Sequence, residues 1–200
     1  MAEHFRDIEK IQDILHEAQT GLWAIELEEG REPRMYADKA MLELLYATGI
    51  RVSELINLKV EDINLAVGFI TCRDEHKERM IPFGKVAKQA MLNYMENGRV
   101  SLLKGQESEW LFTNCSGRPM SRQGFWKIIK FYGEKAGIQA DITPHTLRHS
   151  FAAHLLKNGA DIHAVQAMMG HSDMATTQMY MNYAQGEAVR SAYAGAHPRN

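Results

Sequence analysis

The sequence predicts a mainly α-helical domain with a small antiparallel β hairpin or sheet, which is an α+β fold class. Most of the 200 residues form segments with apolar side chains at helical spacing, separated by glycine, proline or polar stretches. Short β-type runs occur at residues 67–83, and the sequence has no internal repeat or low-complexity tract. With 45% hydrophobic residues, the chain can fill one core or two small ones.

The N-terminal part divides into a helix, a linker and a second helix. Residues 4–19 place apolar side chains at helical spacing, and a polar loop follows them. Residues 35–48 form a strongly apolar helix, and Gly49 suits the left-handed position that ends one. We therefore divide the chain into residues 1–34, an N-terminal helix and linker, and residues 35–200, the main domain.

The later elements are mostly helices. The predicted elements are, in order, a short helix from residue 51, a hairpin over 67–83 with a charged tip, a helix over 85–103, a brief extended piece at 110–113, and helices over 121–136, 144–157, 161–169, 173–183 and 186–195. Ser121 is a good N-cap for its helix.

The helix over residues 144–157 has polar side chains in its first turns. Thr143 is a suitable N-cap, and Pro144 fits the first helical position, so this start is well fixed. His145 and Arg148 then lie about 60° apart on one flank, beside a helix N-terminus that suits an anion. Alternatively, Arg148 pairs with an internal carboxylate and His145 bonds a carbonyl.

The overall charge argues against nucleic-acid binding, but its distribution weakens that argument without excluding an ordinary solvated basic face. The net charge is −2 and the pI about 6.5, whereas residues 118–160 hold 7 Lys or Arg and 2 acidic residues.

Two cysteines, Cys72 and Cys115, are too few for a disulfide framework. No apolar run is long enough to span a membrane, and the start lacks a signal-peptide core. We therefore expect a cytoplasmic protein without membrane contact.

Four segments occur in an order that resembles a known family. They are DKAMLELLYATGIRVSEL, KERMIPFG, TPHTLRHSFAAHLLKNGAD and MGHSDMATTQMY, followed by a tail that reads HPRN. Together they resemble the catalytic domain of the tyrosine recombinase (phage integrase) family, most closely its Xer-type site-specific recombinases. The resemblance runs from about residue 36 to the C-terminus.

The resemblance implies a site-specific DNA recombinase, and it assigns roles to individual residues. Arg51 and Arg148 would grip the phosphate, His145 and His171 would complete the pocket, and Tyr180 would be the nucleophile. Forked guanidiniums can hold the charge of a phosphorane without a metal, and a 3′-phosphotyrosyl ester conserves the bond energy without ATP. We therefore expect no cofactor and no metal.

The tip of the hairpin departs from the family pattern. The family carries a lysine there as general acid for the departing 5′-oxygen, and this position falls near Asp74. An aspartate is a poor proton donor at pH 7 and repels DNA. Either Lys77 or Arg73 takes the role, or cleavage is weak; we assign Lys77 to the catalytic set as a hypothesis.

Several other residues, and two other functions, are alternatives to this assignment. Glu54 is expected to orient Arg51 or to cap locally, His149 to be structural, and Tyr183 to be a weaker candidate nucleophile. His145 and His149, at i and i+4, are conceivable metal ligands, but the glutamate of a zinc hydrolase motif is missing. A DNA-binding protein that kept the fold and lost cleavage is the other alternative.

The expected partner is double-stranded DNA. We expect a monomer in solution and a tetramer on paired DNA sites. Residues 186–200 resemble a segment that family members donate to a neighbouring protomer. The resemblance leads us to expect that the chain lacks the N-terminal DNA-clasping domain of such proteins and that it therefore binds DNA more weakly than a two-domain protein.

Overall fold

The computed structural model describes residues 32–74, 77–138, 142–175 and 177–182, and it confirms the predicted fold class. The elements are α3 (Glu32–Thr48), α4 (Val52–Ile56), η1 (Val60–Asp62), β1 (Ile63–Asn64), β2 (Phe69–Asp74), β3 (Lys77–Pro82), α5 (Lys85–Asn93), η2 (Tyr94–Gly98), α6 (Arg99–Leu103), α7 (Arg122–Lys135), α8 (Pro144–Lys157) and α9 (Ile162–Met169). Residues 174, 175 and 177–182 are also helical.

The structure corrects three details of the predicted elements. Residues 32–34, expected in the linker, belong to α3, where Pro33 fits the first turn because the N–H it lacks would have no helical partner there. The predicted helix over 85–103 contains one π-helical turn, η2. Strand β1 adds a third strand to the predicted hairpin. The segments predicted as helices at 4–19 and 186–195 lie outside the described residues.

The three strands form one antiparallel sheet in the order β1-β2-β3. The register of β2 with β3 includes the pairs Ile70 with Ile81, Cys72 with Arg79 and Asp74 with Lys77. Because side chains alternate between the faces of a strand, Ile70, Cys72 and Ile81 share the buried face. Arg79 is therefore on the face of β3 that meets the protein interior.

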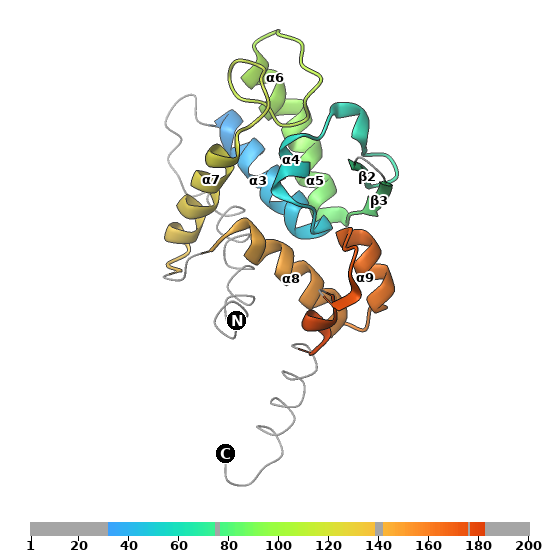
Figure 1. Cartoon of the computed structure of the whole chain (residues 1–200). Coiled ribbons are helices and arrows are strands. Elements are labelled where there is room, and N and C mark those ends of the chain that lie inside the picture. The colour runs from blue at the N-terminus through green and yellow to red at the C-terminus, as the bar shows by residue number, and fades with distance from the viewer. Residues whose placement is uncertain (1–31, 75–76, 139–141, 176, 183–200) are drawn as a thin grey trace.

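Two groups of buried side chains meet at α8. The larger cluster joins α3, α4, the sheet, α5, α7 and Leu147; the smaller joins Phe151, α9 and Tyr180. Figure 1 shows α8 running below the upper helices towards α9, which lies beside the sheet. Arg148 lies between Leu147 and Phe151 in the sequence, so its side chain leaves α8 at the junction of the two clusters.

Gly49 follows α3 and packs against α8. It has φ +61°, as predicted for the residue that follows a helix, and its N–H donates to Leu45 O. A Cβ added here would lie 2.2 Å from Cδ1 of Phe151. The missing side chain lets the turn before Arg51 pack directly against α8.

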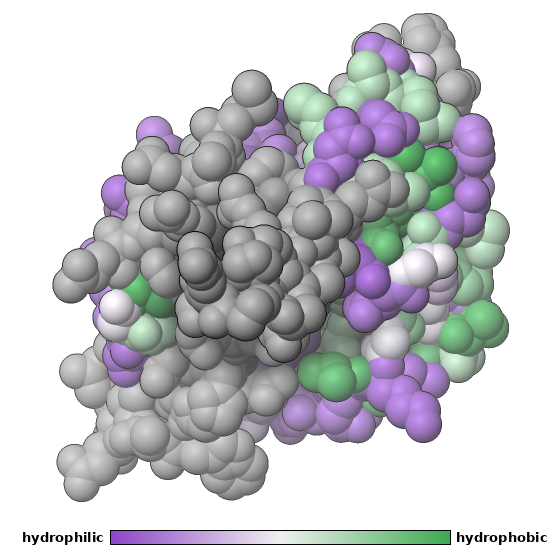
Figure 2. Space-filling model, turned by 90° about the horizontal axis from the view of Figure 1, so that it is seen from below, coloured by the Kyte–Doolittle hydropathy of each residue, from purple (hydrophilic) through white to green (hydrophobic). Residues whose placement is uncertain are grey.

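The surface seen from below mixes hydrophilic patches with scattered hydrophobic ones, as Figure 2 shows for the described residues. The exposed large hydrophobic side chains include Val67, Met80, Val86, Val100, Trp126 and Met179. Within the described ranges, no helix is long and apolar enough to cross a membrane.

Replacing Gly49 with alanine should destabilise the protein by about 2 kcal/mol or more, because a left-handed alanine is strained and its Cβ meets Phe151. Gly133, inside α7 with φ below zero and nothing within 4 Å of an added Cβ, is the matched control. Its alanine variant should gain about 0.5–1 kcal/mol from helix propensity. Urea unfolding measures both, and equal effects of the same sign would contradict the packing argument.

Candidate active site

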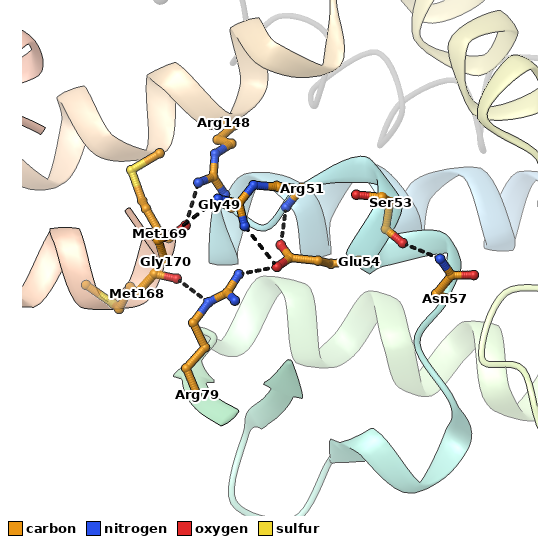
Figure 3. Close-up of polar contacts among 10 residues, drawn as sticks. All are labelled: Gly49, Arg51, Ser53, Glu54, Asn57, Arg79, Arg148, Met168, Met169 and Gly170. Carbon is orange, nitrogen blue, oxygen red and sulfur yellow. Dashed lines mark hydrogen bonds and ion pairs between the residues drawn. The ribbon is translucent and has the colours of Figure 1, made fainter. Parts of the chain in front are cut away.

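Three arginines, from β3, from α8 and from the position before α4, donate to three consecutive carbonyl oxygens at the C-terminal end of α9 (Figure 3). The pairs are Arg79 Nε with Met168 O at 3.0 Å, Arg148 Nη2 with Met169 O, and Arg51 Nη2 with Gly170 O at 3.1 Å. The last carbonyls of a helix have no partner within the helix and carry its partial negative charge. The guanidiniums therefore both satisfy these oxygens and are attracted to them.

Arg148 is held by the start of α8, where Thr143 caps the helix as predicted. Its side chain is 7% exposed, and Nη1 donates to Gly49 O. Among the described residues, Arg148 donates to the backbone carbonyls of Gly49 and Met169 and forms no ion pair with a carboxylate, so the alternative of an internal carboxylate partner is wrong. Burial, followed by the charge of Arg51, lowers the pKa of Arg148 to about 10, so it remains charged at pH 7.

Glu54 joins two of the three arginines. Its Oε2 accepts the backbone N–H of Arg51 at 2.6 Å, and its Oε1 accepts Arg51 Nη1 at 3.3 Å and Arg79 Nη2 at 2.6 Å. The prediction that Glu54 orients Arg51 is thus confirmed. The Arg51 side chain is 42% exposed and those of Glu54 and Arg79 13%, so Arg51 is the guanidinium that solvent reaches most readily.

Tyr180 is 3% exposed and lies in the smaller cluster, with two histidine rings beside its own ring. The ring centroid of His149 is 5.1 Å away, edge-on, and that of His171 is 6.2 Å away, stacked. Burial raises the pKa of the Tyr180 hydroxyl, and the charge of Arg148 opposes this. The arrangement brings a phenol close to the arginine cluster.

His171 directly follows the C-terminal end of α9, which the three arginines bind. Its Nδ1 is 3.0 Å from Thr177 Oγ1. Burial, then the charges of Arg148, Arg51 and Arg79, lower its pKa to about 4. His171 is therefore neutral at pH 7 and can accept or donate a hydrogen bond without adding charge.

His145 and Lys77 are less closely connected to this group. His145 is exposed, and its ring centroid lies 6.3 Å from that of His149, which stands between it and Tyr180. The backbone of Lys77 begins β3 opposite Asp74, and its side chain lies outside the described part. The structure therefore brings together Arg51, Arg148, His171 and Tyr180 among the predicted residues.

Arg73, the other candidate for the hairpin role, is bound elsewhere. It forms ion pairs with Asp62 and with Glu78, the latter at 3.4 Å. These carboxylates, Asp62 first, raise its pKa further above an already high value, so Arg73 is a poor proton donor.

Sequence reasoning missed Arg79. The signal was present: an arginine two residues before Ile81, in a strand whose alternation turns that face inwards, requires a buried partner. A group of three or more His, Cys, Asp or Glu residues placed to bind a metal ion is not found among the residues that the structure describes.

Comparisons of the sequence with known proteins point to one family. The model of the phage integrase family matches residues 5–187. The tyrosine recombinase XerD of Halalkalibacterium halodurans is 49% identical over 193 residues, which are 96% of this chain and 61% of that protein. XerD of Staphylococcus epidermidis is 52% identical over 165 residues, 82% of this chain and 56% of that protein. The chain thus spans about three-fifths of the length of these relatives.

Solved structures share the fold. The crystal structure of XerA recombinase superposes with a TM-score of 0.73 and 28% identity, over 96% of this chain and 65% of that chain. XerH site-specific recombinase bound to a palindromic difH substrate, in a post-cleavage complex, gives a TM-score of 0.75 at 22% identity, over 92% and 51% of the two chains.

The low pKa of His171 should make stability fall in mild acid. The unfolded chain binds a proton near pH 6.5, whereas folded His171 does so near pH 4, so the folded state loses stability as pH falls between these values. Urea unfolding at pH 7 and pH 4.5 should show a larger loss for the wild type than for His171→Asn. A His171 pKa near 6.5 by NMR titration would contradict the assignment.

Proposed function

Because this chain belongs to the phage integrase family, we propose that it is the catalytic part of a site-specific DNA recombinase that cuts and rejoins strands through Tyr180. The observation that carries the proposal is that the buried Tyr180 lies close to the arginine cluster. Among the described residues, Glu54 is the one carboxylate that pairs with these arginines. The site residues and the division into an N-terminal segment and a catalytic domain belong to the same proposal; because α3 crosses the predicted boundary at residues 34 and 35, we place the boundary before Glu32.

The proposed cleavage step uses the chemistry of each group. The Tyr180 oxygen attacks a DNA phosphorus, the bond from phosphorus to the 5′-oxygen breaks, and a 3′-phosphotyrosyl ester and a 5′-hydroxyl result. Arg51 and Arg148 stabilise the charge on the non-bridging oxygens. Each terminal nitrogen of a guanidinium carries two N–H groups, so a phosphate can be bound while the carbonyl contacts remain.

Proton transfer is assigned to the remaining residues. His171, which is neutral at pH 7, accepts the proton that leaves the Tyr180 hydroxyl, and His145 supplies a hydrogen bond to the phosphate. A general acid protonates the departing 5′-oxygen, and Lys77 is our candidate because Arg73 is engaged in two ion pairs. The 5′-hydroxyl of a second strand then attacks the phosphotyrosyl ester, releases Tyr180 and joins the two strands, with no need for ATP or a metal.

The proposed partner is double-stranded DNA, and the assembly is a tetramer on paired sites formed by chains that are monomeric in solution. The positive residues Arg122, Lys127, Lys130 and Lys135 lie on or beside the exposed surface of α7 and support contact with phosphates. Exchange of residues 186–200 between protomers remains part of the proposal. A DNA substrate and two free cysteines support the cytoplasm as the compartment.

A second candidate, DNA binding without cleavage, is favoured by one observation. Asp74 ends β2 where the family has its lysine, and the backbone of Lys77 lies across the hairpin from it. If no side chain protonates the leaving oxygen, the domain grips DNA and does not cut it.

A covalent protein–DNA adduct tests the proposal. On a nicked suicide substrate carrying its cognate site, the wild type should form an adduct and Tyr180→Phe should form none, because the nucleophilic oxygen is gone. Tyr183→Phe is the matched control and should retain the adduct, as should the wild type in excess chelator. An adduct that survives Tyr180→Phe overturns the assignment, and no adduct from the wild type favours the binding-only candidate.

Lys77→Ala should slow cleavage about 100-fold or more, since general acid catalysis contributes about 10²–10⁴-fold. A substrate whose 5′-bridging oxygen is replaced by sulfur needs little leaving-group protonation and should restore the rate. Single-turnover kinetics measure both. Undiminished cleavage of the ordinary substrate by Lys77→Ala removes Lys77 from the mechanism, and Arg73→Ala is then the variant to compare.

A further inference from the structure

We propose that Arg79 is a positioning residue of this site, which ties β3 to Glu54 and to the end of α9 and thereby fixes Arg51 and His171. The inference rests on the proposed function for its effect on cleavage, but its structural part does not. Arg79 donates to Met168 O, a different carbonyl from those that Arg51 and Arg148 bind at the end of α9.

The first support is the pair of acceptors that Arg79 joins. Nη2 donates to Glu54 Oε1 at 2.6 Å, and Nε donates to Met168 O at 3.0 Å. Glu54 is the N3 residue that caps the backbone N–H of Arg51, so a carboxylate held from one side by Arg79 keeps its other oxygen on Arg51. Met168 lies three residues before His171, so the same guanidinium anchors the turn from which His171 projects.

The second support is the shape of the turn at Gly170. A Cβ added there would lie 3.0 Å from Cζ and from Nη1 of Arg79 and 3.2 Å from Nε. Gly170 also has φ +63°, which favours glycine. The flat guanidinium thus packs on the bare backbone of the turn, a contact that a side chain at this position would disturb.

The third support is the requirement for a planar fork. Arg79 is opposite Cys72 on the buried face of the sheet, with its side chain 13% exposed. A guanidinium donates to two acceptors in fixed directions, whereas an ammonium is a point charge on a flexible stem. A lysine at this position keeps the charge but not the rigid bridge between Glu54 and α9.

The experiment compares Arg79→Met and Arg79→Lys in the full chain. Single-turnover cleavage of a nicked suicide substrate should slow about 10- to 100-fold in both variants, because small misplacements of catalytic groups cost rates of this order. Affinity for the same DNA should change less than about threefold, since Arg79 does not itself hold the phosphate. A merely destabilised protein would not separate rate from affinity in this way.

NMR titration of His171 in the DNA-free protein is the second readout. Its pKa is lowered by burial and then by the charges of three arginines, Arg79 among them. It should rise in Arg79→Met, which loses both the charge and the anchor. In Arg79→Lys the His171 resonance should shift or broaden while the pKa rises less.

Arg99→Met is the matched control. Arg99 also bonds two backbone carbonyls, Ser108 O at 2.6 Å and Trp110 O at 3.0 Å, but it lies away from the site. This variant should lose stability and leave the pKa of His171 and the rate of cleavage unchanged.

Wild-type cleavage by both Arg79 variants, or an unchanged His171 in Arg79→Met, overturns the proposal. If Arg79→Met does not fold, the rate and the His171 resonance of Arg79→Lys decide. If the wild type forms no adduct, the proposed function fails, and the His171 titration still tests whether Arg79 positions the turn.

Discussion

The site depends on one constraint: the C-terminal end of α9 is held by three guanidiniums that come from β3, α8 and the residue before α4. The three bonds join residues 89, 21 and 119 positions apart in the sequence. Loop closure over such distances costs entropy, and the two hydrophobic clusters that pack around α8 supply the free energy to meet it. The position of His171 is therefore a consequence of the whole fold.

The same constraint concentrates positive charge. Three guanidiniums bind the negative end of one helix, and among the described residues Glu54 pairs with Arg51 and Arg79 but not with Arg148. The lowered pKa of Arg148 expresses the cost of its burial and of the neighbouring Arg51. A phosphate bound at this place relieves that repulsion, so the folded state without DNA already contains part of the electrostatic driving force for binding.

Local signals in the sequence predicted the elements, because caps and turns depend on neighbouring residues. Thr143, Ser121 and Gly49 have the roles that their types indicate. The sequence could not show that β3 lies beside α9, so Arg79 was missed, although the alternation of β3 turned it inwards. Helical spacing put His145 near Arg148, but only packing decides that His145 is exposed and that His149 contacts Tyr180. The resemblance to a family supplied the roles that spacing could not.

The burial of Tyr180 adds a requirement for cleavage. If Tyr180 is the nucleophile that we propose, its 3% exposure means that the helical residues 177–182 have to shift before the hydroxyl can meet a phosphate. That segment follows α9 through the turn at Gly170 and His171, and the bond between His171 and Thr177 crosses the connection. Because the arginines hold α9 itself, such a shift does not require movement of the guanidiniums that we propose to bind the phosphate. In the proposed mechanism, the anchoring of α9 therefore separates the groups that bind the phosphate from the tyrosine that has to move.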